Sequence, residues 1–243
     1  MNTLIVGSSS GLGKEILEQK IKKGDEIFAI SRYSNHLIYK EHLNQANLII
    51  KADLESFDEQ NQFDPLLKHI PSLDQIYFAI GGGFGRKDLM PSYEDMLLVF
   101  KMNIFVISSI IKSLHEGKKI NKNSKICVIS SIASQEVVAS PAYSSAKSAL
   151  NTFSKIMTKK KNKNFGSLSN FICGAFEGNG TGFDRLRLNN KAAYNNFVNN
   201  RLPNGKTLST SELAAYIITT MDFSTELLDG ITIKVDSNES FSI

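Results

Sequence analysis

The stretch NTLIVGSSSGLGK, residues 2–14, contains an apolar run that leads directly into a glycine-rich turn. The run predicts a buried strand, Asn2–Val6, and the residues after the turn predict a helix, Leu12–Lys23. Glycines in such a turn let the chain bend tightly, approach a pyrophosphate closely and pack the helix against the strand. The free N–H groups of the helix start add further anion-binding capacity. The stretch therefore predicts a dinucleotide-phosphate site, which we assign to Gly7, Ser9, Ser10, Gly11, Leu12 and Gly13.

Short apolar runs alternate with longer helical patterns along the rest of the chain, which is typical of a parallel sheet built from βαβ units. The predicted strands are Asn2–Val6, Glu26–Ser31, Asn47–Lys51, Gln75–Ile80, Lys125–Ser130, Ser169–Cys173 and Ile231–Val235. The predicted helices are Leu12–Lys23, Phe57–His69, Ser92–His115, Ala142–Lys160 and Ser211–Asp222. No repeat or linker divides the chain, so we predict an α/β fold with a doubly wound, Rossmann-type parallel sheet of about seven strands in a single domain, residues 1–243.

The composition narrows the class of protein. In 243 residues, 42% are apolar and the net charge is only +4, so the chain can form a core and does not require a nucleic-acid partner. We find no run of 18 apolar residues and no secretory signal pattern, so we expect no membrane span and a cytoplasmic location. Two cysteines, Cys127 and Cys173, exclude a disulfide scaffold and a structural zinc site made of thiols alone, and we expect no metal. The abundance of Lys, Asn and Ile suggests a bacterial source.

A long, Asn-rich insertion, residues 177–205, lies between the last two predicted strands. Loops of this length in a compact domain are usually lids or disordered, so we interpret it as a substrate lid. Burying amides and cations against hydrocarbon is costly, so a polar lid favours a polar or anionic substrate. Alternatively, its charges face solvent while apolar residues form its buried side. The charged residues at issue are Glu177, Asp184, Arg185, Arg187, Lys191, Arg201 and Lys206.

The end of the second predicted strand distinguishes the two nicotinamide dinucleotides. A carboxylate here would accept hydrogen bonds from the adenosine ribose of NAD and repel a 2′-phosphate. The sequence instead reads Ser31-Arg32, which offers a hydroxyl and a guanidinium suited to a phosphate. We therefore expect NADP(H) rather than NAD(H).

A second group of polar residues follows the fifth predicted strand. Ser131 ends that strand, and Tyr143 and Lys147 come four residues apart at the start of a helix, on one face. The pKa of tyrosine is ordinarily about 10, and a nearby cation favours the phenolate. We expect Tyr143 to act as the acid/base, Lys147 to lower its pKa, and Ser131 to orient a carbonyl or alcohol oxygen.

These motifs together resemble the classical short-chain dehydrogenase/reductase family over essentially the whole chain. The turn is similar to the family's TGxxxGxG, Asp74–Gly81 to its DxLVNNAG strand, and Asp222–Asn238 to its last helix and strand. The resemblance implies that Asn103 completes a catalytic tetrad with Ser131, Tyr143 and Lys147. It also implies cofactor contacts by Asp53, Leu54 and Gly81, with further cofactor contacts from Tyr143 and Lys147 themselves. It further implies a homodimer or homotetramer packed through the helices that carry Asn103 and Tyr143.

The sequence departs from the family pattern at several positions. Phe78 and Ala79 replace two asparagines, Gly174-Ala175 replaces a Pro-Gly pair, and residues 235–238 replace a VDGG turn. Asn179 occupies the usual place of the threonine that clamps the nicotinamide carboxamide. Thr181, two residues later, could take over this contact.

From these residues we predict a hydride-transferring, NADP(H)-dependent oxidoreductase that acts on a carbonyl/alcohol pair, with a sugar-type or 3-oxoacyl-type small-molecule substrate. Two alternatives remain open. One is a dinucleotide-binding sensor or regulator without catalysis, although such proteins commonly lose the Tyr or the Lys. The other is a sugar-nucleotide-modifying enzyme with internal hydride transfer, for which the short C-terminal part leaves little room.

Overall fold

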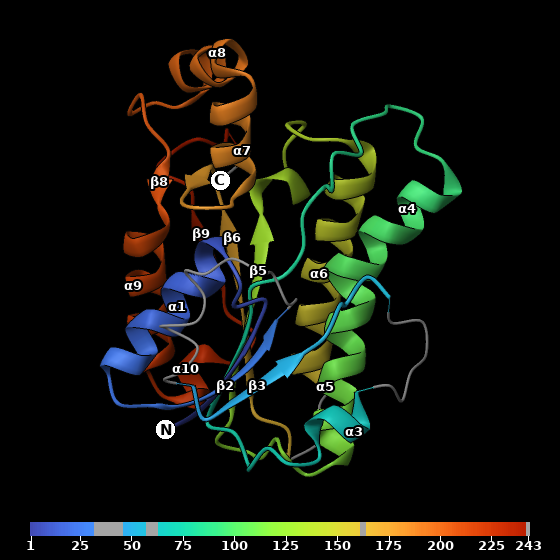
Figure 1. Cartoon of the computed structure of the whole chain (residues 1–243), viewed down its shortest axis with the longest axis vertical. Helices are drawn as coiled ribbons and strands as arrows, with labels where there is room; N and C mark the ends of the chain where they lie inside the picture. Colours follow the sequence, from blue (N-terminus) through green and yellow to red (C-terminus); the bar gives the residue numbers. More distant parts are fainter. Residues whose placement is uncertain (32–45, 57–62, 161–163, 242–243) are drawn as a thin grey trace.

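The computed structural model describes residues 1–31, 46–56, 63–160 and 164–241. A seven-stranded parallel sheet in the order β3-β2-β1-β4-β5-β6-β9 forms its centre (Figure 1). The order reverses beside β1, as in doubly wound sheets, so the predicted fold class is confirmed. The strands are β1 (Asn2–Val6), β2 (Glu26–Ser31), β3 (Leu48–Lys51), β4 (Gln75–Phe78), β5 (Lys125–Ser131), β6 (Ser167–Cys173) and β9 (Thr232–Val235).

Helices cover both faces of this sheet, and successive strand residues point to opposite faces. In β1, Leu4 and Val6 join a core with the helices of one face, whereas Ile5 joins the core of the other. The first face carries α3 (Asp64–Leu67), α5 (Val106–Glu116) and α6 (Pro141–Lys160). The second face carries α1 (Gly11–Lys22), α9 (Thr210–Met221) and α10 (Thr225–Leu228), and α1 packs against α9. Burial on both sides explains why the strands read as nearly continuous apolar runs.

Five strands differ from their predicted bounds: β3, β5 and β9 differ by one residue at one end, and β4 and β6 differ by two. β4 ends at Phe78 rather than Ile80 because the chain turns at Gly81 and Gly82, whose φ angles are +116° and +144°. β6 begins at Ser167 rather than Ser169 because Ser167 and Leu168 still pair with β5. Of the helix predicted over 57–69, the structure has α3, and residues 57–62 lie outside the described residues.

The helix predicted over 92–115 is present, but it is not uniform. α4 (Tyr93–Phe100) passes through a π-helical segment, η1 (Lys101–Phe105), into α5. The stretch Tyr93–Glu116 is long and apolar enough to cross a membrane by length and composition, contrary to the expectation that no segment would pass this test. About half of its most apolar window is buried inside the protein, and Ile107, Ile110 and Leu114 lie in the core, as in a core helix.

The predicted lid, residues 177–205, is mostly helical rather than an extended loop. It contains α7 (Gly182–Asn189) and α8 (Lys191–Arg201), each of which begins at a capping side chain. The short strands β7 (Phe176–Glu177) and β8 (Leu208–Ser209) flank these helices and pair with each other. Figure 1 shows both helices beyond the carboxyl ends of β5 and β6.

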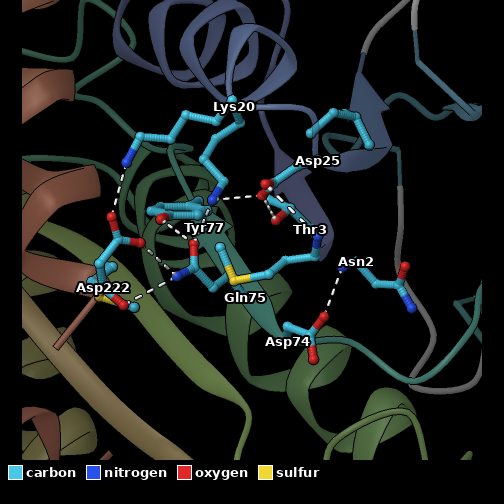
Figure 2. Close-up of polar contacts among 12 residues, drawn as sticks. Asn2, Thr3, Lys20, Asp25, Asp74, Gln75, Tyr77 and Asp222 are labelled. Atoms are coloured by element: carbon cyan, nitrogen blue, oxygen red, sulfur yellow. Dashed lines mark hydrogen bonds and ion pairs between the residues drawn. The ribbon is translucent and has the colours of Figure 1, made fainter. Parts of the chain in front are cut away.

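A buried polar cluster lies at the opposite, amino-terminal edge of the sheet (Figure 2). The Lys20 ammonium is fully buried, 2.5 Å from an Asp25 carboxylate oxygen and 2.9 Å from the Gln75 amide oxygen. Burial raises the pKa of the Tyr77 phenol well above its usual value, so this phenol stays protonated and donates to Gln75 at 2.7 Å. Gln75 also donates to the Met221 carbonyl, so the cluster joins α1, the central strands and α9.

Candidate active site

The glycine-rich turn between β1 and α1 has the geometry that its sequence predicts. Gly7 has a φ of +89°, and its N–H donates to the Ile30 carbonyl at 2.8 Å. A Cβ on Gly13 would lie 2.1 Å from the Gly7 carbonyl oxygen, so only glycine lets the first turn of α1 pack this closely. The turn therefore places the start of α1 directly at the end of β1.

The same turn suits a phosphate group. α1 begins at Gly11 without a side-chain cap on its N–H groups, which leaves N–H groups of its first turn available to an anion. Ser9 is half-buried and Ser10 is exposed, whereas Ser8 and Leu12 are buried. The Ser8 hydroxyl has no hydrogen-bond partner within the described part of the chain. Ser8 was not among the predicted cofactor residues, and no sequence signal separates it from Ser9 and Ser10.

A segment that follows β6 packs against this turn. The Asn179 carbonyl accepts a hydrogen bond from the Gly11 N–H at 2.8 Å, and the Thr181 methyl lies 3.0 Å from the position of a Cβ on Gly11. The Thr181 hydroxyl caps α7 by accepting from the Asp184 N–H at 3.2 Å. Asn179 and Thr181, the two residues considered for the nicotinamide clamp, therefore both lie beside the glycine-rich turn. The Thr181 hydroxyl is also used as the N-cap of α7.

The remaining predicted cofactor residues follow neighbouring strands. Ser31 is buried at the end of β2, and Arg32, on which the NADP(H) prediction depends, lies outside the described residues. After β3, Asp53 is exposed and its carboxylate accepts from the Glu55 N–H at 3.2 Å, while Leu54 is buried. These residues follow β2 and β3, the two strands beside β1 on the side away from β4.

Tyr143 and Lys147 lie one turn apart at the start of α6. The helix begins with Pro141, whose fixed φ suits a first helical position, and the Ser140 hydroxyl accepts from the Tyr143 N–H at 3.4 Å. The Lys147 ammonium lies 5.8 Å from the centre of the Tyr143 ring. The predicted face of the helix is therefore formed, with the two side chains adjacent.

Ser131 ends β5 beside these residues, and its hydroxyl accepts from the Ala133 N–H at 3.2 Å. Its side chain also lies close enough to the Tyr143 phenol to influence the pKa of that phenol. Burial raises the pKa of Tyr143 to about 12, and the Ser131 side chain opposes this rise only in part. The predicted downward shift from Lys147 is not seen in this structure, because Lys147 is not among the groups that shift this pKa and burial dominates.

Lys147 is almost fully buried. Its ammonium donates to the Ile129 carbonyl at 2.7 Å, which holds the side chain against the end of β5. Burial lowers the pKa of Lys147 to about 8. The pKa of this amine therefore lies close to neutral pH, where the amine can both release and accept a proton.

Asn103 is fully buried in the π-helical segment η1, and the structure brings it close to Lys147. Its amide donates to the Val99 and Gly82 carbonyls at 2.7 and 2.9 Å, and its oxygen accepts from the Gly82 N–H at 3.1 Å. A Cβ on Gly81 would lie 2.3 Å from the Asn103 oxygen and 3.1 Å from the Lys147 ammonium. The tight turn after β4 thus places the Asn103 amide and the Lys147 amine next to each other.

Sequence reasoning did not find a polar chain that supports Ser131. The Ser134 hydroxyl donates to the Ser131 carbonyl at 2.6 Å and accepts from the Asn151 amide at 2.7 Å. Asn151 in turn accepts from Asn170 on β6 at 2.9 Å. This chain fixes the turn after β5 to α6, and its members come from segments that only the fold brings together.

A cavity of about 680 Å³ lies beside α7, the first lid helix, and its lining residues do not include Ser131, Tyr143 or Lys147. It is bounded by α7, by the segment around β8 and by Asn179, the residue that contacts the glycine-rich turn. Within the described ranges, no three His, Cys, Asp or Glu side chains gather in a way that could hold a metal ion.

Comparison with known proteins agrees with the family resemblance seen in the sequence motifs. The family model described as short chain dehydrogenase matches residues 1–177. A search of curated protein sequences found no match.

Solved structures with the same fold include a short chain dehydrogenase family protein from Francisella tularensis subsp. tularensis SCHU S4, with 19% identity, a TM-score of 0.78 and coverage of 98% of each chain. L-sorbose reductase from Gluconobacter frateurii, solved with NADPH and L-sorbose, has 18% identity, a TM-score of 0.80 and coverage of 99% of this chain and 97% of that chain. RhlG of Pseudomonas aeruginosa, solved as an NADP active-site complex, has 20% identity, a TM-score of 0.80 and coverage of 97% and 94%. At these identities the likeness is one of fold.

Proposed function

Because this chain belongs to the short-chain dehydrogenase/reductase family of NAD(P)-dependent oxidoreductases, we propose that it transfers a hydride between NADP(H) and a carbonyl/alcohol substrate. The observation that carries the proposal is the cluster of Ser131, Tyr143 and Lys147 at the carboxyl end of β5, in which the Lys147 ammonium lies 5.8 Å from the centre of the Tyr143 ring and the Ser131 side chain lowers the pKa of Tyr143. The close packing of Gly13 on Gly7 and the unpartnered Ser8 hydroxyl support the assignment of the glycine-rich turn to the pyrophosphate.

The bound nicotinamide supplies or accepts the hydride, and the residues of the chain handle the proton. Tyr143, held protonated by its high pKa, donates its phenolic proton to the oxygen of a carbonyl substrate. Ser131 holds the same oxygen and the phenol in one hydrogen-bonded geometry. Lys147, with its pKa near 8, can return a proton toward Tyr143, and Asn103 fixes the turn beside that amine.

The preference for NADP(H) rests on Arg32, which follows Ser31 at the end of β2 without a neighbouring acid. We expect Arg32→Ala to reduce the preference for NADPH over NADH about tenfold or more, because a charge-assisted phosphate contact is worth about 1.5–3 kcal/mol. Fluorescence titration with both cofactors measures this ratio. Lys22→Ala, which removes an equal charge from an exposed position at the end of α1, is the control and should leave the ratio unchanged. An unmodified protein that binds NADH as tightly as NADPH would overturn the assignment.

We propose a polar substrate, of a sugar or 3-oxoacyl type. The lid carries many polar side chains, but Arg185 and Arg187, the two arginines of α7, already have partners. Arg187 binds the Glu177 and Asp184 carboxylates, and Arg185 donates to the Gly180 carbonyl at 2.7 Å. Lys191 and Lys206 are exposed. Because Arg185 and Arg187 are engaged by the protein, a hydroxylated neutral substrate fits the lid better than a highly charged one.

The decisive experiment measures NADPH oxidation against a panel of ketones, keto-sugars, phosphorylated sugars and 3-oxoacyl thioesters. Turnover of one polar class above the others supports the proposal. Turnover that is best with an apolar ketone would refute the polar-substrate assignment. Tight NADPH binding without net oxidation of any carbonyl would favour a regulator, and conversion of a sugar nucleotide without net cofactor change would favour internal hydride transfer.

We also propose that the chain acts as a cytoplasmic homodimer or homotetramer with each chain a single domain. The helices that carry Asn103 and Tyr143 expose apolar side chains that a monomer would leave in water, at Leu97 (43%), Phe105 (48%) and Ile156 (49%). Light scattering coupled to size-exclusion chromatography gives the oligomeric state, and a monomer across the micromolar range would refute this proposal.

A further inference from the structure

Arg201, the last residue of α8, lies where three segments of the candidate site meet. Its Nε lies 3.6 Å from a carboxylate oxygen of Glu239 in the C-terminal tail. Its Nη2 lies 4.0 Å from a carboxylate oxygen of Glu136, five residues after Ser131. Arg201 therefore joins the lid to the tail and to the turn that follows β5.

Both carboxylates are fixed to parts of the chain that lead into the site. Glu239 is buried and accepts from the Ala175 N–H at 2.6 Å, at the start of the segment that reaches Asn179 and the glycine-rich turn. The Glu136 N–H donates to the Ile132 carbonyl at 2.8 Å within the turn after Ser131. A movement of α8 relative to Glu136 and Glu239 is therefore also a movement relative to the turn after Ser131 and to the segment that reaches the glycine-rich turn.

The contacts of Arg201 are incomplete in this structure. Its Nε and Nη2 are buried and have no hydrogen-bond partner in the described part of the chain. Charge-assisted N–H···O bonds are about 2.7–2.9 Å long, so an approach of about 1 Å would turn both ion pairs into hydrogen bonds. Val198 in α8 and Leu202, the residue after this helix, pack against Ala175 in an apolar cluster. Apolar contacts are not directional, so this contact does not oppose a shift of that size.

We propose that Arg201 is a positioning residue that closes the lid: α8 moves toward the tail, and its guanidinium then bonds Glu136 and Glu239 together. Closure brings the polar side of the lid over the carboxyl ends of β5 and β6 and holds the segment 174–181 against the glycine-rich turn. The response to cofactor rests on the proposed function, whereas the tethering of the lid by Arg201 does not.

Hydrogen exchange of the lid, residues 182–201, tests the tether directly. In Arg201→Met, which keeps the apolar stem, exchange in the lid should rise by about fivefold or more, the lower end of typical coupling between sites. Glu239→Gln, which leaves Arg201 in place, should have the same effect in the same peptides. Lys191→Met removes an equal charge from the start of α8, where no ion pair is found among the described residues, and should leave exchange unchanged.

NADPH is the probe for closure. It should slow lid exchange in the unmodified protein, fail to do so in Arg201→Met, and do so in part in Arg201→Lys, which can still bind one acid. Exchange in β1 and α9 should be the same in all variants, which shows that the fold is intact. Lid exchange that is equal in Arg201→Met and Lys191→Met would overturn the inference, and so would NADPH binding that leaves the lid unaffected. Failure of NADPH to bind would refute the proposed function, and the ligand-free comparison would still decide the tether.

Discussion

Replacement of Tyr143 by phenylalanine is expected to lower turnover by about 10²–10⁴-fold, the usual contribution of general acid–base catalysis. The change removes one hydroxyl from a half-buried ring on α6 and leaves the glycine-rich turn untouched. Cofactor affinity should therefore stay measurable, and the loss should fall on kcat rather than on the dissociation constant of NADPH.

The pKa values of Tyr143 and Lys147 predict how the rate of carbonyl reduction changes with pH. Burial raises the pKa of Tyr143 to about 12, so the phenol is protonated at neutral pH and is ready to donate in carbonyl reduction. Burial lowers the pKa of Lys147 to about 8, so its ammonium loses its proton as the pH rises through this value. Carbonyl reduction should be nearly constant from pH 6 to about 7 and should fall to about half at pH 8, as Lys147 ceases to be a proton source.

Steady-state kinetics with the best substrate of the panel, at pH 6–9, measures both effects. Tyr93→Phe is the matched control, because Tyr93 is 74% exposed at the start of α4 and its hydroxyl lies on the surface. This control should retain the full rate. Wild-type turnover in Tyr143→Phe would show that the proton comes from another group.

The sequence was sufficient to predict the parallel strands, the main helices and the glycine-rich turn, because each of them depends on a local pattern. Continuous apolar runs predicted the parallel strands, and the helix between Pro141 and Lys160 was readable from its period and its start. The adjacency of Tyr143 and Lys147 follows from spacing alone, since residues four apart share a helix face. The glycine-rich turn was readable because its close packing at Gly13 tolerates no side chain.

Other features of the site depend on contacts between distant segments. The helical period does not distinguish the π-helical segment 101–105 from an ordinary α-helix, yet that segment holds Asn103 against the turn after β4. The polarity of residues 177–205 suggested a loop, whereas their few apolar side chains seat two short helices. The bond between Glu239 and Ala175 joins residues 64 positions apart, and no local pattern signals it.

The buried cluster at the amino-terminal edge of the sheet should be the most sensitive place for stability (Figure 2). We expect Lys20→Ala to lower the free energy of unfolding by about 3–5 kcal/mol, as is usual when one partner of a buried ion pair is removed. The Asp25 side chain is only 4% exposed, and without Lys20 its carboxylate keeps the Thr3 hydroxyl, at 2.7 Å, and the N-terminal amine, at 3.8 Å. These contacts compensate a buried charge less well than the ammonium at 2.5 Å.

Urea unfolding followed by circular dichroism measures this loss, and the chain offers a matched control. Lys23, also on the α1 side, pairs with Asp222 at 2.8 Å, but both side chains are 40% or more exposed, so Lys23→Ala should cost only about 0–1 kcal/mol. The double variant Lys20→Met/Asp25→Ala should recover part of the loss, because no unpaired charge then remains in the cluster. Equal midpoints for Lys20→Ala and Lys23→Ala would mean that water or a neighbouring donor solvates Asp25. In that case the cluster would contribute no more than a surface ion pair.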